Sequence, residues 1–318
     1  MIPAKGVYLM PAELFEFINT NINLYKTCKS FYYFRSIFYK HFIIDMDTNM
    51  YFQLTSIRHG LFVYENNIPP DIISYMKNNS YQFINFNQPL IELPKQLTHL
   101  TFADNFDQPL IELPKTLTHL TFGYCFRQPL IELPKQLTHL TFGTYFNQPL
   151  IELPKSLTHL TFGSYFIQPL IELPKSLTHL TFGDSFNQPL IELPARGGSL
   201  IPKQLTHLTF GSSFNQPLIE LPKQLTHLTF GWYFNQPLIE LPKQLTHLTF
   251  GYSFNQPLIE LPKQLTHLTF GNSFNQPLIE LPKSLTYIKI SKNYNQLIHV
   301  KNLPPLIQFY IEDKLIKL

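Results

Sequence analysis

The chain has 318 residues, of which 44% are hydrophobic, and this is enough apolar material for a folded core. Its 24 lysines and arginines nearly balance its 21 aspartates and glutamates, and the absence of a basic cluster argues against nucleic acid as a partner. Two cysteines cannot form a disulfide framework, and the sequence has neither the apolar run of a signal peptide nor a stretch of ~20 apolar residues. We therefore expect a soluble cytoplasmic protein that binds neither nucleic acid nor membranes.

Residues 1–60 are rich in Phe, Tyr and Ile and contain no repeat. A helix is expected to begin at Pro11, because proline is favoured in the first turn of a helix. Leu14 and Ile18 then lie on one apolar face of that helix, at the spacing of a helical turn.

A second helix is expected over the segment KTCKSFYYFRSIF, which contains Cys28 and Phe31. The two helices would form a small α-helical N-terminal domain. Residues 61–85, in which Ile68 precedes two prolines, are expected to be one degenerate copy of the repeat that follows and to join the helical domain to it.

Residues 86–293 consist of a 20-residue unit, FNQPLIELPKQLTHLTFGxx, in ten near-identical copies. One step is 28 residues long, because the extra residues ARGGSLIP stand at 195–202, after which the register resumes. Fixed spacing of this kind predicts a solenoid, and we expect the insertion to bulge from a loop. Residues 294–318 are predicted to be a decayed copy and a C-terminal cap. The copies begin at Phe86, Phe106, Phe126, Phe146, Phe166, Phe186, Phe214, Phe234, Phe254 and Phe274.

Each unit contains one strand pattern, in which Leu100 and Phe102 alternate with His99 and Thr101. Two prolines per unit exclude a helix on the return path, so that path is expected to be extended, with leucines such as Leu90 filling the core. Identical strands one repeat apart stack in parallel, about 4.8 Å apart. The predicted strands are 97–102, 117–122, 137–142, 157–162, 177–182, 205–210, 225–230, 245–250, 265–270, 285–290 and 306–311.

The LTHLTF segment matches the L-x-x-L-x-L strand of leucine-rich repeats, and the unit resembles their 20-residue form. Where those repeats have Asn after the strand, this chain is variable, and Phe and usually Asn follow instead. This FN-x-P signature resembles the FNIP repeat family. The resemblance implies a leucine-rich-repeat-like solenoid of parallel strands with an extended, polyproline-like convex side, joined to the small α-helical N-terminal domain.

The missing Asn leaves open which side chains satisfy the turning backbone inside the solenoid. Glutamine is the candidate, because every copy has it at the position of Gln88. The neighbouring Asn is replaced by Asp107, Arg127 and Ile167 in three copies, which argues against a buried Asn ladder. Alternatively, the glutamine is retained only because the copies are recent duplicates.

The start of the chain resembles an F-box. In that motif an L-P-x-E-[IL] opening precedes a V-C-[KR]-x-[FW] segment, and here LMPAEL at 9–14 precedes KTCKSF at 26–31, with Met10 interrupting the Leu-Pro pair. The resemblance implies that the N-terminal helices bind the Skp-type adaptor of a cullin–RING ubiquitin ligase. The alternative is that residues 1–60 only cap the open end of the solenoid. The residues implied in adaptor binding are Pro11, Leu14, Ile18, Cys28 and Phe31.

Nine histidines recur in register from His99 to His267, and Tyr287 ends the series. On a parallel sheet they form one solvent-facing row, for which we consider three roles: solvated strand residues, a response to pH, or a metal site. A specific zinc site needs three or four converging ligands with outer hydrogen-bond partners, and a straight row is expected to provide neither. We therefore predict no metal site.

Glu92 and Lys95 recur as two further rows on the return path, where they are expected to neutralise each other as a solvated network. Paired catalytic carboxylates must differ from each other in environment, and nothing distinguishes one of these glutamates from the next. No phosphate-binding glycine loop or nucleophile motif is present. We therefore expect no catalytic residues and no cofactor.

The positions that vary between copies point to a binding surface. They lie mainly at the two residues after the strand glycine, where Tyr, Ser, Asn and Trp alternate as in the binding loops of antibodies. Drift at tolerant loop positions is the alternative reading, although it does not explain so many aromatics. The predicted partner-binding residues are Tyr124, Tyr145, Tyr165, Trp232, Tyr233 and Tyr252.

The sequence as a whole predicts a non-catalytic protein that binds other proteins. By resemblance, it is expected to be the substrate-recognition subunit of a cullin–RING ubiquitin ligase, in the cytoplasm or, if viral, the host cytoplasm. The N-terminal helices would then bind the adaptor while the repeats hold a target protein. The alternative is a plain repeat scaffold without a link to ubiquitin.

Overall fold

The computed structural model describes four short strands before residue 87 and most of the chain after it. The chain divides into two compact units, Met1–Leu137 and Thr138–Leu318, and each is described by itself. The described residues are 31–32, 42–45, 61–64, 80–84, 87, 89–90, 93, 95–190, 200–218, 220–238, 240–258, 260–278, 280–296, 304, 307–311 and 314–316.

The described part of the first unit is a row of paired strands. The first two strands pair antiparallel, and from the second strand onward each pairs in parallel with the next. In the intact repeats His99 lies opposite His119. The strands are β1 (Phe31–Tyr32), β2 (Phe42–Asp45), β3 (Leu61–Tyr64), β4 (Ser80–Ile84), β5 (His99–Thr101) and β6 (His119–Thr121).

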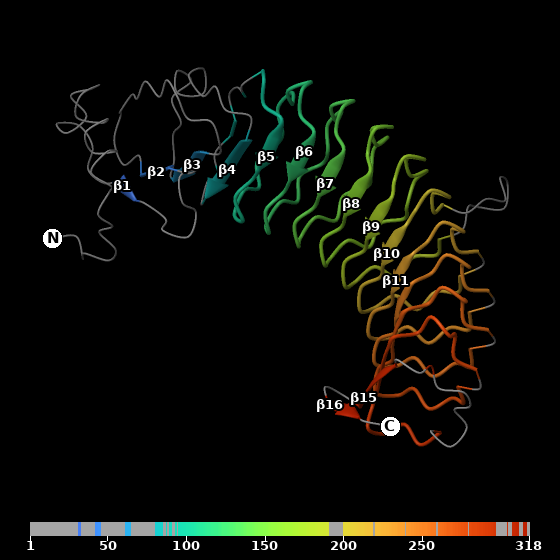
Figure 1. Ribbon diagram of the computed structural model, residues 1–318. Helices are drawn as coiled ribbons and strands as arrows, with labels where there is room; N and C mark the ends of the chain where they lie inside the picture. The colour runs from blue at the N-terminus through green and yellow to red at the C-terminus, as the bar shows by residue number, and fades with distance from the viewer. Residues whose placement is uncertain are drawn as a thin grey trace. The chain divides into compact units, whose positions relative to one another are not determined.

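The second unit continues the same pattern with parallel pairing up to an antiparallel strand at its end. Figure 1 shows its repeat strands side by side, with the return segments running back beside them. The strands are β7 (His139–Thr141), β8 (His159–Thr161), β9 (His179–Thr181), β10 (His207–Thr209), β11 (His227–Thr229), β12 (His247–Thr249), β13 (His267–Thr269), β14 (Tyr287–Ile290), β15 (Gln308–Ile311) and β16 (Lys314–Ile316).

The repeat strands are three residues long rather than the six predicted, because a tight turn lies on each side of them. Before β8 the Leu157 N–H donates to the Pro154 carbonyl at 3.0 Å, and after it the Phe166 N–H donates to the Gly163 carbonyl at 3.2 Å. The parallel stack of strands predicted from the repeat is confirmed. The last two predicted strands, 285–290 and 306–311, are likewise shorter, at Tyr287–Ile290 and Gln308–Ile311.

Columns of leucine and phenylalanine fill the core. Around β7 the side chains of Leu140, Phe142 and Phe146 are at most 3% exposed. Phe142 stacks on Phe146 within the repeat, with ring centroids 4.1 Å apart, and each ring stacks on its counterpart in the next repeat. Leucines of the return path close the core, as predicted for Leu90. Burial of each such side chain contributes about 1.5–3 kcal/mol.

The predicted glutamine ladder is present, and it runs through half-buried residues. Gln256 Nε2 donates to the backbone carbonyl of Asn235 in the preceding repeat, at 3.2 Å. It also donates to Asn235 Oδ1 at 3.1 Å, and this oxygen accepts a second bond from the Asn255 N–H at 2.9 Å. Glutamine and asparagine therefore act together. The pair satisfies backbone hydrogen-bonding groups at the turn, as an Asn ladder does in leucine-rich repeats.

The sequence argued only against a buried Asn ladder, and the structure shows that the Asn position takes part in a half-buried one. Asp107 Oδ1 accepts the same two bonds, from the Arg127 N–H and from Gln128 Nε2. At Ile167 the side chain offers no acceptor, and Gln188 Nε2 still donates to the Ile167 carbonyl at 3.0 Å. Since solvent reaches these residues, one rung with an unsuitable side chain is tolerated.

The glycine that follows most repeat strands is required by close stacking of the turns, although Ala103 and Ser291 take its place after β5 and β14. A Cβ placed on Gly163 would overlap the carbonyl oxygen of Gly143 in the preceding repeat, and Gly231 meets Gly211 in the same way. Because these contacts are to backbone, a larger residue forces neighbouring turns apart.

The insertion leaves the register of the stack unchanged, as predicted. Strands β9 and β10 pair with His179 opposite His207 although 28 residues separate them. Ile201 and Pro202 are buried, as the Leu-Pro pair is in other repeats. Ile201 and Pro202 therefore take the place of that pair in this repeat, and the bounds 195–202 of the insertion stay a prediction.

Most of the predicted N-terminal domain lies outside the described residues. Within 1–60 the described residues are the strands β1 and β2, and Phe31 lies in β1 where a helix was expected. Residues 61–85 contain two strands, β3 and β4, which pair in parallel. The boundaries predicted for these segments stay predictions. The other residues implied in adaptor binding, which lie outside the described part, are Pro11, Leu14, Ile18 and Cys28.

Candidate interaction surface

A two-residue turn follows each repeat strand, between the strand glycine and the buried phenylalanine. Successive turns are joined by backbone hydrogen bonds, such as Tyr165 N–H to the Thr144 carbonyl and Tyr233 N–H to the Ser212 carbonyl, both at 2.9 Å. The turns therefore extend the strand ladder and hold their side chains at fixed spacing. We call the turns of the second unit the turn row: 144–145, 164–165, 184–185, 212–213, 232–233, 252–253 and 272–273.

Large exposed apolar side chains gather at these turns. In the part of the chain whose side chains the structure describes, seven large apolar residues are strongly exposed, and five of them occupy turn positions. Tyr145, predicted with them, is half-buried. The remaining two are Ile167 and Leu315. The five are Tyr124, Tyr165, Trp232, Tyr233 and Tyr252, with exposed fractions of 46%, 51%, 51%, 57% and 41%.

The structure brings the predicted binding residues of the second unit together as two aromatic stacks. Tyr145 and Tyr165 stack with ring centroids 5.1 Å apart and an interplanar angle of 4°. Trp232 and Tyr252 stack at 4.6 Å and 3°, and Tyr233 is the residue next to Trp232 in the same turn. The repeat spacing in the sequence predicts neighbouring rungs, but not the ring orientation.

The sixth predicted residue, Tyr124, lies in the first unit and is exposed at its turn. Sequence reasoning missed the polar residues between the two stacks. Asp184 accepts hydrogen bonds from Ser212 Oγ at 2.9 Å and from Ser164 Oγ at 3.4 Å, and so links three successive turns. The signal was available, because Asp184 is the sole acidic residue in the turn row.

The histidines form a second row, at the opposite end of the same strands. Their rings stack at centroid distances of 4.1–4.3 Å in the second unit. Thr226 Oγ1 donates to the Thr206 carbonyl at 3.1 Å, which uses its one hydrogen, so it accepts from His227 Nδ1 at 2.9 Å. The repeated Thr–His pair thereby fixes the tautomer, with the proton on Nδ1 and the acceptor on Nε2.

Five histidines of the row have lowered pKa values. Burial, together with repulsion from positive charge on neighbours such as His179 and His227, lowers the pKa of His207 from 6.5 to about 4. Desolvation is likewise the largest cause of the lowered pKa values of four other histidines. These are His159, His179, His227 and His247.

One reason given for excluding a metal from this row was wrong. The histidines do have the outer hydrogen-bond partner that metal ligands need, since each Nδ1 bonds to a threonine, as His247 does to Thr246. The histidine rings stack face to face on their neighbours, as His227 does on His247. No group of three or more His, Cys, Asp or Glu side chains suited to a metal ion occurs among the described residues.

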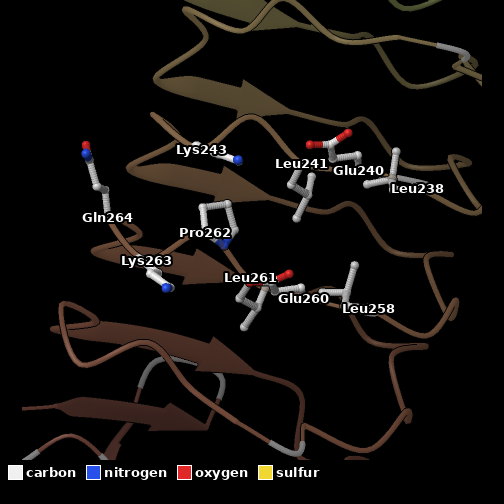
Figure 2. A pocket seen from close by; sticks show the side chains of 10 residues that line it. All are labelled: Leu238, Glu240, Leu241, Lys243, Leu258, Glu260, Leu261, Pro262, Lys263 and Gln264. Atoms are coloured by element: carbon white, nitrogen blue, oxygen red, sulfur yellow. The ribbon is translucent and has the colours of Figure 1, made fainter.

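On the return path, shallow grooves lie between some neighbouring repeats. Figure 2 shows the one between 238–243 and 258–264, with a volume of about 460 Å³. In this view Lys243 and Lys263 lie to the left of Glu240 and Glu260, and leucine side chains also line the groove. Similar grooves occur between other repeats. Because every rung offers the same residues, the groove distinguishes no position along the solenoid.

No helix long and apolar enough to cross a membrane is found in the part of the chain that the structure describes. Comparison with curated proteins found no relative.

Two of the solved structures that resemble this chain are CroV588 and YopM. CroV588, described as a novel circular LRR protein, has 45% identity and a TM-score of 0.71, over 80% of this chain and 40% of that one. YopM from Yersinia enterocolitica has 23% identity and a TM-score of 0.53, over 79% of this chain and 63% of that one. This chain therefore spans less than two thirds of either structure. YopM supports the fold alone.

The family comparison agrees with the repeat seen in the strands and turns. The FNIP Repeat model matches residues 86–125, 126–165, 146–172, 166–213, 196–233, 214–253, 234–273, 254–280 and 274–309. FNIP and leucine-rich repeat solenoids are typically non-catalytic scaffolds suited to protein binding. With these matches across more than half of its length, the chain belongs to the FNIP-repeat family.

Proposed function

We propose that this chain is a non-catalytic interaction protein that holds a target protein along its turn row. The observation that carries the proposal is the exposure of Tyr165, Trp232, Tyr233 and Tyr252 at turns whose backbone is tied into the strand ladder. Tyrosine and tryptophan dominate the binding energy of many protein interfaces, because they bury a large area and lose little side-chain entropy.

The stacking of these rings supports the proposal further. Trp232 is held against Tyr252, and Tyr145 against Tyr165, so part of the entropy that binding would remove is already lost in the free protein. The histidine and lysine–glutamate rows, by contrast, are the same in every repeat and offer a partner no preferred position. A partner that recognises one register along the solenoid must contact residues that differ between rungs.

We test this proposal by placing a photo-crosslinking residue at Tyr233 in the full-length chain. A second chain carries the same residue at Glu240, which is also exposed and lies on the return path that follows this turn. In cells, a defined target should crosslink to position 233 and not to position 240. It should then bind the purified wild-type chain, and more weakly a chain with Trp232→Ser. Equal crosslinking at both positions would contradict the proposal.

We further propose that the target is presented to a ubiquitin ligase. The support is the resemblance of residues 9–31 to an F-box, in which Pro11, Leu14 and Ile18 would face a Skp-type adaptor. The chain would then accelerate ubiquitin transfer by bringing target and ligase together, without chemistry of its own. This role places the protein in the cytoplasm, or in the host cytoplasm if it is viral.

Co-elution of the full-length chain with a Skp-type adaptor tests this role. We expect a one-to-one complex that is lost in the variant Leu14→Asp, because a carboxylate on the apolar helix face has to be desolvated on binding. Leu315→Asp is the matched control, since Leu315 is 51% exposed near the other end of the chain. If the wild-type chain does not bind the adaptor, the alternative holds: a repeat scaffold whose residues 1–60 serve as a cap.

A further inference from the structure

A gap of small residues separates the two aromatic stacks of the turn row. Tyr165 and Tyr233 are three strand steps apart, which at about 4.8 Å per step is about 14 Å. Within this distance the largest turn side chain is that of Asp184, and it is exposed. We call this gap the notch, and its residues are Asp184, Ser185, Ser212 and Ser213.

Two aromatic rings border the notch: Tyr165, at the second position of the turn before it, and Trp232, at the first position of the turn after it. Parallel rings with centroids only 4.6 Å or 5.1 Å apart lie face to face, since rings placed edge to edge in one plane cannot approach so closely. Tyr145 therefore covers one face of Tyr165 and leaves the other toward the notch. Tyr252 does the same for Trp232, and both wall residues remain 51% exposed.

The floor of the notch is a carboxylate held in a fixed orientation. Asp184 Oδ1 accepts from Ser212 Oγ at 2.9 Å and from the Ser212 N–H at 3.4 Å, and Oδ2 accepts from Ser164 Oγ at 3.4 Å. A carboxylate has about four lone-pair sites, so acceptor capacity remains. All three donors are neutral, and the turn row contains no lysine or arginine. The notch therefore keeps a local negative charge.

A cation is the ligand that fits a carboxylate between two aromatic faces. The negative face of an aromatic ring attracts a cation at the same time as the carboxylate does. A guanidinium fits better than an ammonium, because it is planar, stacks on an aromatic face and donates two parallel bonds to a carboxylate.

We propose that the notch binds an arginine side chain of the target protein, with its guanidinium on the Asp184 carboxylate and its plane against Tyr165 or Trp232. This rests on the proposed function and makes it more specific. The notch is the one place in the turn row where an acid lies between two aromatic stacks, so it also sets the register of the target along otherwise identical repeats.

The sole tryptophan of the protein, Trp232, lies in a wall of the notch and reports its occupancy by fluorescence. The full-length chain is titrated with the peptide acetyl-Gly-Arg-Gly-amide, and with the same peptide carrying Lys or Gln in place of Arg. We expect a saturable change with the arginine peptide, and binding about tenfold weaker for the lysine peptide. The glutamine peptide should cause no saturable change.

Two variants should remove the notch without disturbing the stacking of the repeat strands. Asp184→Ser and Tyr165→Ser each introduce the residue that a neighbouring rung already has at that position, as Ser164 and Ser185 do. Both should weaken arginine binding, Asp184→Ser by about tenfold or more because the charged partner is lost. Asp104→Ser changes the same turn position in the first unit and should leave binding unchanged.

If the arginine and lysine peptides bind equally well, the assignment of arginine is overturned. If Asp184→Ser binds the arginine peptide with wild-type affinity, the site itself is overturned. If the arginine peptide causes no saturable change, the site is overturned as well. The outcome is separate from that for the proposed function. If a target still crosslinks at Tyr233 while the notch binds no arginine, the turn row is an interaction surface but the notch is not its cation site.

Discussion

The histidine row and the turn row lie at opposite ends of the same strands, yet they differ in how their residues change along the solenoid. The histidines repeat at every rung, with the same ring stacking and the same bond to threonine. In the turn row, Asp184, Ser212 and Trp232 occupy one position in three successive rungs. A residue that is the same in every rung contributes equally everywhere, whereas recognition of a target in one register requires residues that differ.

This difference indicates that the repeated residues stabilise the solenoid and that the variable residues recognise the target. Repeated residues such as Phe214, Thr226 and Gln256 hold one rung to the next. The turn residues are attached to that frame by their backbone, so their side chains are free to change. Mutations at repeated positions should therefore affect stability, and mutations in the turn row should affect binding. Each prediction below tests one part of this separation.

The largest effect is expected for Phe214→Ala, compared with Ser213→Ala in the adjoining turn. Phe214 is fully buried and stacks on Phe210 at a centroid distance of 4.0 Å. Its truncation should cost about 3–5 kcal/mol, through lost burial and the cavity left behind. Ser213→Ala should change the free energy of unfolding by less than about 0.5 kcal/mol. Urea denaturation of both variants measures the difference, and equal costs would contradict the separation.

The pH dependence of stability is the next largest effect, and it should come from the histidine row. Five histidines of the folded state, from His159 to His247, have pKa values below 6.5, while histidines of the unfolded chain titrate near 6.5. Between 6.5 and about 4 the unfolded state therefore binds more protons, and stability is lost as the pH falls through this range. The melting temperature should be constant above about pH 7 and several degrees lower at about pH 5.

Substituting the centre of the row checks the origin of this effect. The variant with Gln in place of His179, His207 and His227 should lose less stability between about pH 7 and pH 5 than the wild-type chain does. Glutamine also changes the ring stacking of the row, so the melting temperature of the variant at neutral pH can differ from that of the wild-type chain. The quantity to compare is therefore the change in stability between the two pH values. An unchanged pH dependence would assign the effect to other groups.

The parts predicted from the sequence are those that the repeat itself determines. The 20-residue spacing fixed the parallel stacking and the buried leucine and phenylalanine columns, and the variable positions pointed to Tyr165 and Trp232. The strand length was wrong, because strand propensity does not register the turns that Pro154 and Gly163 close on each side. Ring stacking and the bonds of Asp184 depend on contacts between rungs, which one repeat does not contain.

The hydrogen bond between threonine and histidine should contribute less to the free energy of unfolding than the ring stacking and burial around it. Thr226→Val keeps the shape of the side chain but removes the donor to the Thr206 carbonyl and the acceptor for His227 Nδ1. We expect a loss of about 0.5–1.5 kcal/mol in the free energy of unfolding, measured by urea denaturation. The nitrogen chemical shifts of His227 should also show a mixture of tautomers. A retained single tautomer would mean that another contact fixes the ring.

The smallest effect should be a gain in stability, at the rung where the Asn–Gln ladder has no side-chain acceptor. Ile167→Asn introduces an oxygen that can accept from the N–H of Asn187 and from Gln188, as Asn235 Oδ1 does from the next repeat. It also removes an isoleucine that is 45% exposed. We expect a gain of about 0.5–1 kcal/mol.

Two matched variants separate the ladder from the removal of an exposed apolar side chain. Ile167→Asp supplies an acceptor like that of Asp107, which accepts from the N–H of Arg127 at 2.9 Å, so it should stabilise as Asn does. Ile167→Ala removes most of the apolar surface without supplying an acceptor, and it should leave stability nearly unchanged. If all three variants gain equally, exposure explains the effect. If Asn and Asp alone gain, the half-buried ladder stabilises the stack at each rung, independently of the target that the turn row binds.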